Sequence, residues 1–332
     1  MTDVKEFVRF ARGRGLLAIA CAAMLPMQSA HADELKKINY VFDWSTPDHE
    51  LIPVIVAKDQ GLYKEAGLDV NIIFPPDSAT TASLLLAGSG DIGFETTTDV
   101  TFGHEQGAPI VSIGNFIQGN NWCLFGRPGE PVDMTKLEGK SIGVYTDSWT
   151  KAMMPFVLKK AGLNADQVKE IIVESSMPIL LAGKIDIATN TANYGTAGVQ
   201  SAVGKDPTMV CARELGAPDV PIWVYTASQP WLDQNGDAAT KFMAATQKAT
   251  EWAIANPDKA VDLFGKYYPD NANAAYDRVG WNSLLPYFKN ADGKMMVQSA
   301  DIWKSLAEAL KATDQIKEVP DPNVYFTNKY LP

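Results

Sequence analysis

The chain has 332 residues, of which 46% are hydrophobic and 20% are charged, an ordinary composition for a soluble globular protein. This length predicts two domains rather than one. The formal net charge of −10 argues against nucleic acid or an anionic membrane surface as the partner.

The first 32 residues have the pattern of a secretory signal peptide. Basic residues up to Arg14 precede an apolar run over 15–25, and Ala30-His31-Ala32 forms a small-x-small cleavage site. The apolar run is shorter than the about 20 residues that a membrane-spanning helix needs. We therefore expect export, cleavage after Ala32 and a periplasmic location.

Strands and helices alternate over residues 38–116, which is typical of a parallel sheet with helices on both faces. We expect strands over 38–42, 69–74, 91–94 and 110–116, with helices over 49–60 and 80–87. The loop from Asp43 to His49 follows the first strand, at the edge where open α/β sheets bind ligands.

The composition changes to Gly, Asn and Pro over 118–131, which indicates a crossing between domains. A second α/β series follows, with strands over 141–145 and 171–173. The strand over 221–226 is expected to return to the first lobe, where helices over 238–255, 257–267, 272–285 and 299–312 pack. The predicted fold class is therefore α/β, with two doubly wound lobes joined by crossing strands. We place lobe 1 at 33–120 and 225–332, and lobe 2 at 121–224.

A short segment occurs twice. Residues 85–92 (LLAGSGDI) recur as residues 180–187 (LLAGKIDI), each as a helix end, a Gly turn and a short strand. Coincidence in two common turns is the alternative. Together with the crossing, the repeat favours two lobes of similar build with a ligand at their interface. Cys123 and Cys211 remain in the mature chain, and either a disulfide or two buried thiols is compatible with the sequence.

Polar and aromatic side chains follow the predicted strands, and we expect them to contact a small-molecule ligand. For each loop the alternative is ordinary helix capping or packing. An indole has little local structural reason to lie in a strand-exit loop, which favours ligand contact at the first loop. The candidates are Asp43, Trp44, His49, Glu95, Thr96, Trp122, Tyr145, Asp147, Ser148, Trp149, Asn190, Asn193, Tyr194 and Trp223.

The sequence gives no convincing catalytic or metal-binding motif. The sequence has no Cys-x-x-Cys or His-Glu-x-x-His stretch, and Met134 stands where a phosphate loop before Lys140-Ser141 needs its first glycine. His49 and His104 are too few and too isolated for a metal site. We predict no catalytic residue, no metal and no cofactor.

The candidate loops carry carboxylates and few cations. An oxyanion site more often shows Arg or Lys, whereas carboxylates beside indoles suit a flat, nitrogen-bearing or cationic ligand. Helix N-termini bind anions without cations, so an anionic ligand stays an alternative.

The run over 57–70 (AKDQGLYKEAGLDV), followed by 87–93 and 106–112, resembles periplasmic substrate-binding proteins related to the thiamine-pyrimidine precursor synthases. Residues 256–260 and 325–328 extend this similarity over most of the mature chain. The family includes binders of pyrimidine precursors, riboflavin-type precursors, sulfonates, taurine and nitrate. The resemblance implies a two-lobed type II binding-protein fold that closes on its ligand and delivers it to the permease of an ABC importer.

The spacing from Asp43-Trp44 to His49 is one residue shorter than in the pyrimidine binders, and the cysteine cluster of the enzymatic relatives is absent. We predict a monomeric, non-enzymatic binding protein for an aromatic N-heterocycle such as a thiamine pyrimidine precursor. The alternatives are a binder of a small sulfonate, taurine or nitrate-like anion and, less favoured, an exported enzyme on the same fold.

Overall fold

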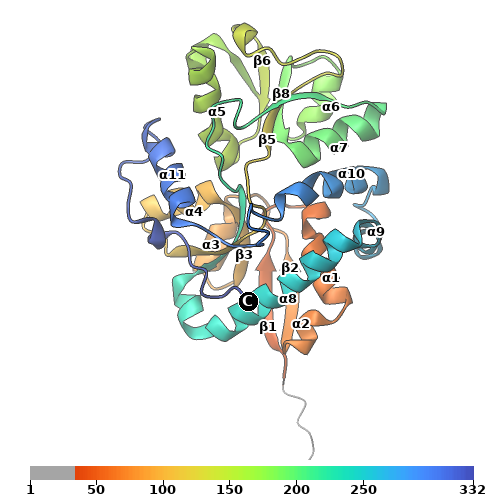
Figure 1. The fold of residues 1–332 in the computed structure, drawn as a ribbon, viewed down its shortest axis with the longest axis vertical. Helices are drawn as coiled ribbons and strands as arrows, with labels where there is room; N and C mark the ends of the chain where they lie inside the picture. The colour runs from red at the N-terminus through yellow and green to blue at the C-terminus, as the bar shows by residue number, and fades with distance from the viewer. Residues whose placement is uncertain (1–33) are drawn as a thin grey trace, which may run out of the picture. The chain divides into compact units, whose positions relative to one another are not determined.

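The computed structural model describes residues 34–332, so the predicted signal peptide and its cleavage site lie outside the described residues. Two five-stranded sheets form the centres of two lobes (Figure 1). In the part of the chain that the structure describes, no helix has the length and apolar character needed to cross a membrane.

The first sheet has the strand order β2-β1-β3-β10-β4. Strand β1 pairs in parallel with β2 and β3, whereas β10 is antiparallel to β3 and β4. Strands β3 and β10 are buried along their whole length because they occupy the interior of the sheet. The five strands are β1 (Lys36–Val41), β2 (Leu68–Ile73), β3 (Ile92–Thr96), β4 (Ile110–Asn115) and β10 (Trp223–Ser228).

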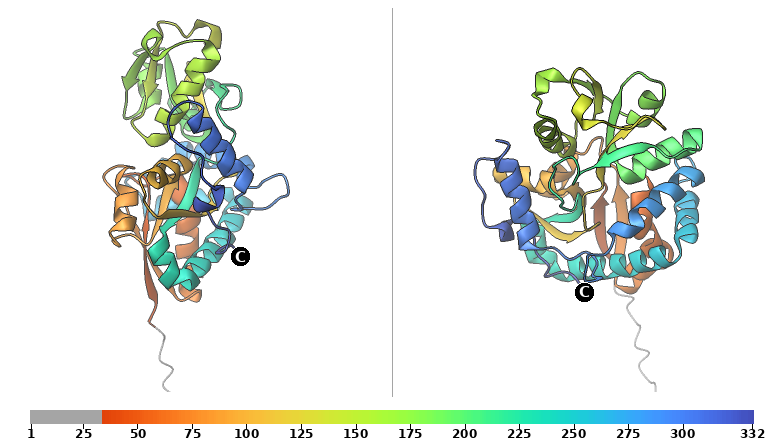
Figure 2. Two further views of the ribbon diagram at one scale, coloured as in Figure 1. Left: turned by 90° about the vertical axis from the view of Figure 1, so that its left-hand side faces the viewer. Right: turned by 45° about the horizontal axis from the view of Figure 1, so that its top comes forward.

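Helices lie on both sides of this sheet (Figure 2), as the alternation of elements predicted. The turn η1 (His49–Leu51) leads directly into α1 (Ile52–Asp59). Pro53 lies in the first turn of α1, where a missing N–H breaks no hydrogen bond. The other helices of this series are α2 (Leu62–Glu65), α3 (Thr80–Leu86) and α4 (Thr97–Glu105).

The second sheet repeats the strand order of the first, as β7-β6-β8-β5-β9. Strand β5 is antiparallel to both neighbours and takes the place that β10 has in the first sheet. Each of these two strands is the one by which the chain enters a lobe after a crossing. The strands are β5 (Trp122–Gly126), β6 (Ser141–Val144), β7 (Lys169–Ile172), β8 (Ile187–Thr191) and β9 (Thr208–Cys211). The helical elements are η2 (Met134–Lys136), α5 (Ser148–Ala161), η3 (Ala165–Gln167), α6 (Ser176–Leu181) and α7 (Ala192–Val203).

The C-terminal helices are close to their predicted ranges. They are α8 (Gln229–Ala255), α9 (Pro257–Tyr267), α10 (Ala274–Leu284) and α11 (Ala300–Lys311), with the turns η4 (Leu285–Tyr287) and η5 (Pro322–Val324). Helix α8 begins earlier than predicted because a kink at Asn235 joins a preceding helical segment to it. The predicted packing on the first lobe holds for α8, which contacts α1, but α10 also packs against α7 of the second lobe (Figure 1). The predicted return to lobe 1 at residue 225 falls inside β10, and the lobe boundaries stay a prediction.

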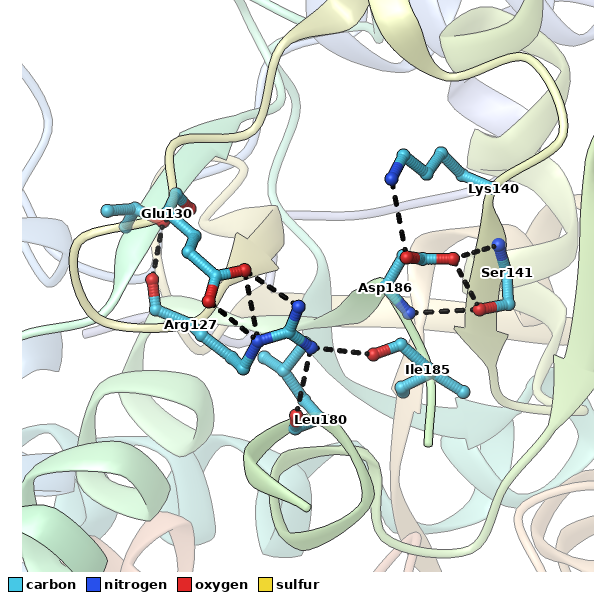
Figure 3. Close-up of polar contacts among 8 residues, drawn as sticks. Arg127, Glu130, Lys140, Ser141, Leu180, Ile185 and Asp186 are labelled. Carbon is cyan, nitrogen blue, oxygen red and sulfur yellow. Dashed lines mark hydrogen bonds and ion pairs between the residues drawn. The ribbon is translucent and has the colours of Figure 1, made fainter. Parts of the chain in front are cut away.

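The repeated segment has the same role in both lobes. The glycine of each copy has a positive φ, 70° and 67°, which permits the sharp turn after α3 and after α6. Asp91 then accepts the backbone N–H of Asn39 at 2.7 Å, and Asp186 accepts that of Ser141 at 2.9 Å (Figure 3). Asp91 therefore ties β3 to β1, and Asp186 ties β8 to β6.

Two further links occur in the second lobe. A Cys123–Cys211 disulfide joins β5 to β9, which decides between the two states that the sequence allowed. The Arg127 guanidinium donates to the Glu130 carboxylate and, at 3.1 Å, to the carbonyl of Ile185 (Figure 3). This side chain thus fixes the turn between α6 and β8.

Candidate ligand-binding site

A cavity of about 970 Å³ lies between the two lobes. Its wall is built by the loops after β1 and β2 of the first lobe and after β6, β7 and β8 of the second. Open α/β sheets bind ligands at this edge, and the volume is near the upper end of the roughly 300–1,000 Å³ typical of small-molecule sites. The predicted contact residues on the wall are Trp44, Trp122, Tyr145, Asp147, Trp149, Asn190, Tyr194 and Trp223.

Four tryptophans form the aromatic part of the wall. Trp44 follows β1, Trp149 lies in the first turn of α5, and Trp122 and Trp223 begin β5 and β10. The Nε1–H groups of Trp122, Trp149 and Trp223 are buried and have no hydrogen-bond partner among residues 34–332. A buried donor without a partner is destabilising, so these groups are suited to an acceptor atom that a ligand brings.

The indole of Trp223 is held from behind by the core of the first lobe. It stacks on Phe94 with the ring centroids 5.2 Å apart and the planes at 11°. Phe94 in turn stacks on Phe42 at 5.4 Å. The aromatic wall is therefore continuous with the hydrophobic core, which fixes its position before any ligand binds.

The second lobe contributes a network around Tyr145. The Tyr145 hydroxyl accepts the backbone N–H of Ser176 at 3.0 Å and the side-chain N–H of Asn190 at 3.1 Å. Burial raises the pKa of this hydroxyl. These contacts orient the Tyr145 ring on the cavity wall.

Two carboxylates on the wall also cap helical turns. Asp147 accepts the N–H of Thr150 at 2.7 Å at the start of α5, and Asp48 accepts that of Glu50 at 2.8 Å at the start of η1. Burial raises the pKa of both carboxyls. Thr191, which precedes α7, has a buried hydroxyl without a partner in the described chain and also lines the cavity.

His49 and Asn193 lie off the cavity wall, fully buried in a contact between the lobes. The Nδ2 atom of Asn193 lies 2.9 Å from His49 Nε2 and donates to Glu50 at 3.0 Å. Asn121 donates to the Asn193 carbonyl oxygen at 3.0 Å. We call this group the His49 contact. Burial, with repulsion from the neighbouring Asp48, raises the pKa of Glu50 well above its ordinary value.

Ser148 and Thr96 also lie off this wall and join the lobes elsewhere. The Ser148 hydroxyl lies 3.0 Å from that of Thr96 and 2.8 Å from that of Thr98, so the starts of α4 and α5 face each other. Thr96 and Asp99 form a capping box at the start of α4. We call this group the Ser148 contact. Ser148 also borders a second cavity of about 440 Å³.

Asp43 and Glu95 are buried inside the first lobe, away from the cavity wall. Thr226 donates to Glu95 at 2.5 Å, and Thr81 donates to Asp43 at 3.5 Å. Burial, followed by repulsion from Asp99, raises the pKa of Glu95 to about 8 and that of Asp43 well above its usual range. For the six predicted residues off the wall, a ligand-contact role stays a prediction.

Sequence reasoning missed several wall residues, among them Tyr276 and Asp277. Tyr276 and Asp277 lie on α10, which was expected only to pack on the first lobe. One signal was present in the sequence: Asp277 occupies the same helical stripe as the buried Trp281 and Leu284. A carboxylate among apolar positions of a helix indicates a polar site facing that stripe.

The charged groups on the wall are all acidic. No lysine, arginine or histidine lies among its described lining residues, and no cluster of His, Cys, Asp and Glu suited to a metal ion occurs in residues 34–332. Such a wall can stack on a flat ring and accept hydrogen bonds from ligand N–H groups. It lacks the cations that usually neutralise a bound oxyanion. The acidic members are Asp48, Asp77, Asp147, Glu174 and Asp277.

Two α/β lobes with one strand order and a cavity between them form the fold of periplasmic binding proteins. The periplasmic aliphatic sulphonate binding protein SsuA from Escherichia coli has the same fold, with a TM-score of 0.70 and 14% identity over 89% of this chain and 99% of that chain. The family model described as NMT1/THI5 like matches residues 48–260, and the chain belongs to this family. The predicted fold class and family resemblance are thereby confirmed.

Relatives in this family have names of two kinds. The formylaminopyrimidine-binding protein of Halalkalibacterium halodurans is 23% identical over 310 residues, which cover 91% of this chain and 93% of that protein. The 4-amino-5-hydroxymethyl-2-methylpyrimidine phosphate synthase of Candida albicans is 24% identical over 309 residues, covering 89% and 88%. Proteins similar to this chain are thus named both as binders and as synthases.

Proposed function

We propose that this protein is an exported, monomeric solute-binding protein that captures an aromatic N-heterocycle between its lobes and delivers it to the permease of an ABC importer. The ligand class is that of a thiamine pyrimidine precursor. The observation that carries the proposal is the cavity wall itself, with four indoles, acidic side chains and no cation among its described residues. The printed names of the pyrimidine-related relatives support the same ligand class.

Hinge closure supplies the mechanism. The His49 contact and the Ser148 contact join the lobes at two places away from the cavity wall. A ligand that touches both lobes stabilises the closed arrangement in which these contacts form, so its binding shifts the population toward that form. The contacts themselves contribute to closure without touching the ligand.

Export is proposed from the sequence pattern of residues 1–32, and delivery to a permease from the family resemblance. Purified protein from a periplasmic fraction, analysed by intact mass, tests export. A mass that begins at residue 33 supports cleavage after Ala32, whereas a full-length mass in the cytoplasm contradicts it.

A ligand panel tests the proposed function. Isothermal titration and thermal unfolding are measured with 4-amino-5-hydroxymethyl-2-methylpyrimidine, its N-formyl-aminomethyl analogue, taurine, an alkanesulfonate and nitrate. A ligand stabilises the state that it binds, so a raised melting temperature with the pyrimidines supports the proposal. Stabilisation by the sulfonates or nitrate alone would replace it with the anion alternative.

The same panel separates binding from catalysis. Pyrimidine recovered chemically unchanged after denaturation of the complex supports a binding protein. Steady turnover would make the protein an exported enzyme, the class to which the synthase name of the Candida albicans relative points.

Trp44 is the first residue to test. Its replacement by alanine is expected to weaken pyrimidine binding by about 1–3 kcal/mol if the indole stacks on the ligand. Trp252→Ala on α8, outside the cavity, is the control for loss of an indole. Equal titration curves for Trp44→Ala and the unmodified protein would remove Trp44 from the site.

A further inference from the structure

Most carboxylates of the cavity wall have no counter-ion within the described chain, the exception being Asp277, whose Oδ1 lies 3.8 Å from His49 Nδ1. Asp48, Asp147 and Glu174 form no ion pair with any residue in 34–332, and the wall has no basic side chain in that range. Lys151 lies near Asp147, but it is exposed and borders the second cavity rather than this one. A ligand that enters the large cavity therefore meets uncompensated negative charge.

The carboxylates of Asp48 and Asp147 have unused hydrogen-bond acceptor positions. Each carboxylate accepts only one backbone N–H within the described chain, at the start of η1 and of α5. A carboxylate has roughly four lone-pair positions, so each retains capacity for further donors. Burial raises the pKa of both carboxyls, although hydrogen bonds oppose the shift in both and the His49 imidazole opposes it in Asp48. A positive charge nearby would favour their ionised form.

The aromatic side chains surround the same space. An indole face attracts a cation through its quadrupole, and cages of aromatic rings are a known way to hold cationic nitrogen. One face of Trp223 is covered by Phe94, and its ring still lines the cavity. The buried N–H groups of Trp122, Trp149 and Trp223 add an independent requirement, because each lacks an acceptor among the described residues. The ligand must supply acceptor atoms as well as charge.

We propose, building on the proposed function, that the ligand of this cavity is a positively charged nitrogen heteroaromatic rather than a neutral one. Its cationic part lies among the indoles beside Asp48 and Asp147, and a ring nitrogen or carbonyl accepts from the free indole N–H groups. An anion and a neutral pyrimidine both supply acceptor atoms, but neither brings the positive charge.

Two probes that differ in charge test this proposal. The mature protein is titrated at pH 7 with 4-amino-5-aminomethyl-2-methylpyrimidine, whose ammonium is positively charged, and with the neutral 5-hydroxymethyl compound. The two share the ring and nearly the same size. The cationic probe is expected to bind at least tenfold more tightly. Equal affinities, or tighter binding of the neutral probe, would overturn the charge assignment and leave the proposed pyrimidine ligand standing.

Asp147→Asn is the matched variant. Asparagine is as good a helix cap as aspartate, so α5 keeps its start while the wall loses one charge. The variant is expected to weaken binding of the cationic probe about tenfold and that of the neutral probe by much less. Asp166→Asn, an exposed position in the same lobe, controls for net charge. Equal losses for both probes in Asp147→Asn would contradict a role for its charge.

If neither pyrimidine binds, the proposed pyrimidine ligand is refuted, and the charge assignment is decided with quinoline and N-methylquinolinium. Tighter binding of the quinolinium would support a cationic ligand of another ring class. Equal binding, or binding of neither, would overturn the charge assignment as well.

Discussion

The two lobes share a backbone plan and differ in what they place at the ends of their strands. Both have the same strand order, and both use an aspartate to tie two parallel strands, Asp91 between β3 and β1 and Asp186 between β8 and β6. The repeat aligns Glu95-Thr96 at the end of β3 with Asn190-Thr191 at the end of β8. In the first lobe these residues are satisfied within the protein, whereas in the second they reach the cavity wall.

Thr96 and Thr191 illustrate the difference. Thr96 caps α4 and completes a capping box, but Thr191 makes no side-chain cap, and its hydroxyl is buried without a partner in the described residues. The same residue type at the same position thus serves helix stability in one lobe and is free for a ligand in the other. The repeat gives the two threonines equivalent positions, and side chains from distant segments determine whether each hydroxyl is hydrogen-bonded within the protein.

Removal of the disulfide is expected to have the largest effect and to fall on the second lobe alone. Cys123 and Cys211 are 88 residues apart in sequence, and a cross-link over such a loop contributes about 2–5 kcal/mol. Cys123→Ala with Cys211→Ala should lower the free energy of unfolding by that amount in urea titrations. Hydrogen exchange should show faster exchange in β5 and β9 and unchanged exchange in β1 and β3. Equal loss of protection in both lobes would contradict independent stabilisation of the second.

Glu95 makes the first lobe sensitive to pH. Its folded-state pKa of about 8 exceeds the ordinary value of 4.5, so folding takes up a proton. That contribution is complete below pH 4.5 and is lost as pH rises through about 8. At about 1.4 kcal/mol per pKa unit, the shift from 4.5 to about 8 corresponds to at most about 5 kcal/mol. Glu95→Gln, which imitates the amide of Asn190, should flatten the fall in melting temperature between pH 4.5 and 8.5.

Glu170→Gln in the exposed strand β7 is the control for that measurement and should leave the pH profile unchanged. A Glu95→Gln profile identical to that of the unmodified protein would assign the pH dependence to other carboxyls.

The two anchoring aspartates should have effects of similar size, with that of Asp186 the larger because it also accepts from the Ser141 hydroxyl and pairs with Lys140. Asp91→Ala and Asp186→Ala each remove the acceptor of a backbone N–H between parallel strands, which is expected to cost about 1–3 kcal/mol of unfolding free energy. Denaturant titration measures the unfolding free energy of each variant. Costs that differ by more than about 2 kcal/mol would show that the repeat has diverged in function.

The smallest effects should separate the two threonines. Thr96→Val loses a helix cap and should lower stability by about 1 kcal/mol. Thr191→Val keeps the volume and breaks no hydrogen bond of the described chain, so we expect little change in stability. Its pyrimidine affinity should fall by about 0.5–1.5 kcal/mol if the hydroxyl contacts the ligand. Unchanged affinity in Thr191→Val would remove its hydroxyl from the site.

Much of the fold was predictable because hydrophobic periodicity and the polar residues that follow strands are local features of the sequence. The sequence indicated the alternation of strands and helices, the repeat that holds Asp91 and Asp186, and the loops that end at the interface of the lobes. Strand β9 escaped prediction, and β5 was included in the crossing, since short strands next to Gly-rich segments carry a weak pattern.

The orientation of individual side chains depended on distant partners. His49 meets Asn193, which is 144 residues away, so its imidazole joins the lobes, a contact that the local sequence did not indicate. Helix α10 reaches the cavity because it packs on α7, and its periodicity shows only that one stripe is buried, not which lobe covers it. Local sequence patterns contain no information about such pairings.

The position of the tryptophans has a practical consequence. Four of the eight tryptophans in the chain line one cavity, and Trp223 is coupled to the core by its stack on Phe94. Ring stacking and a new acceptor on an indole N–H both alter indole emission. Intrinsic fluorescence is therefore a label-free reporter of cavity occupancy, and single Trp→Phe variants can assign the signal to individual positions on the wall.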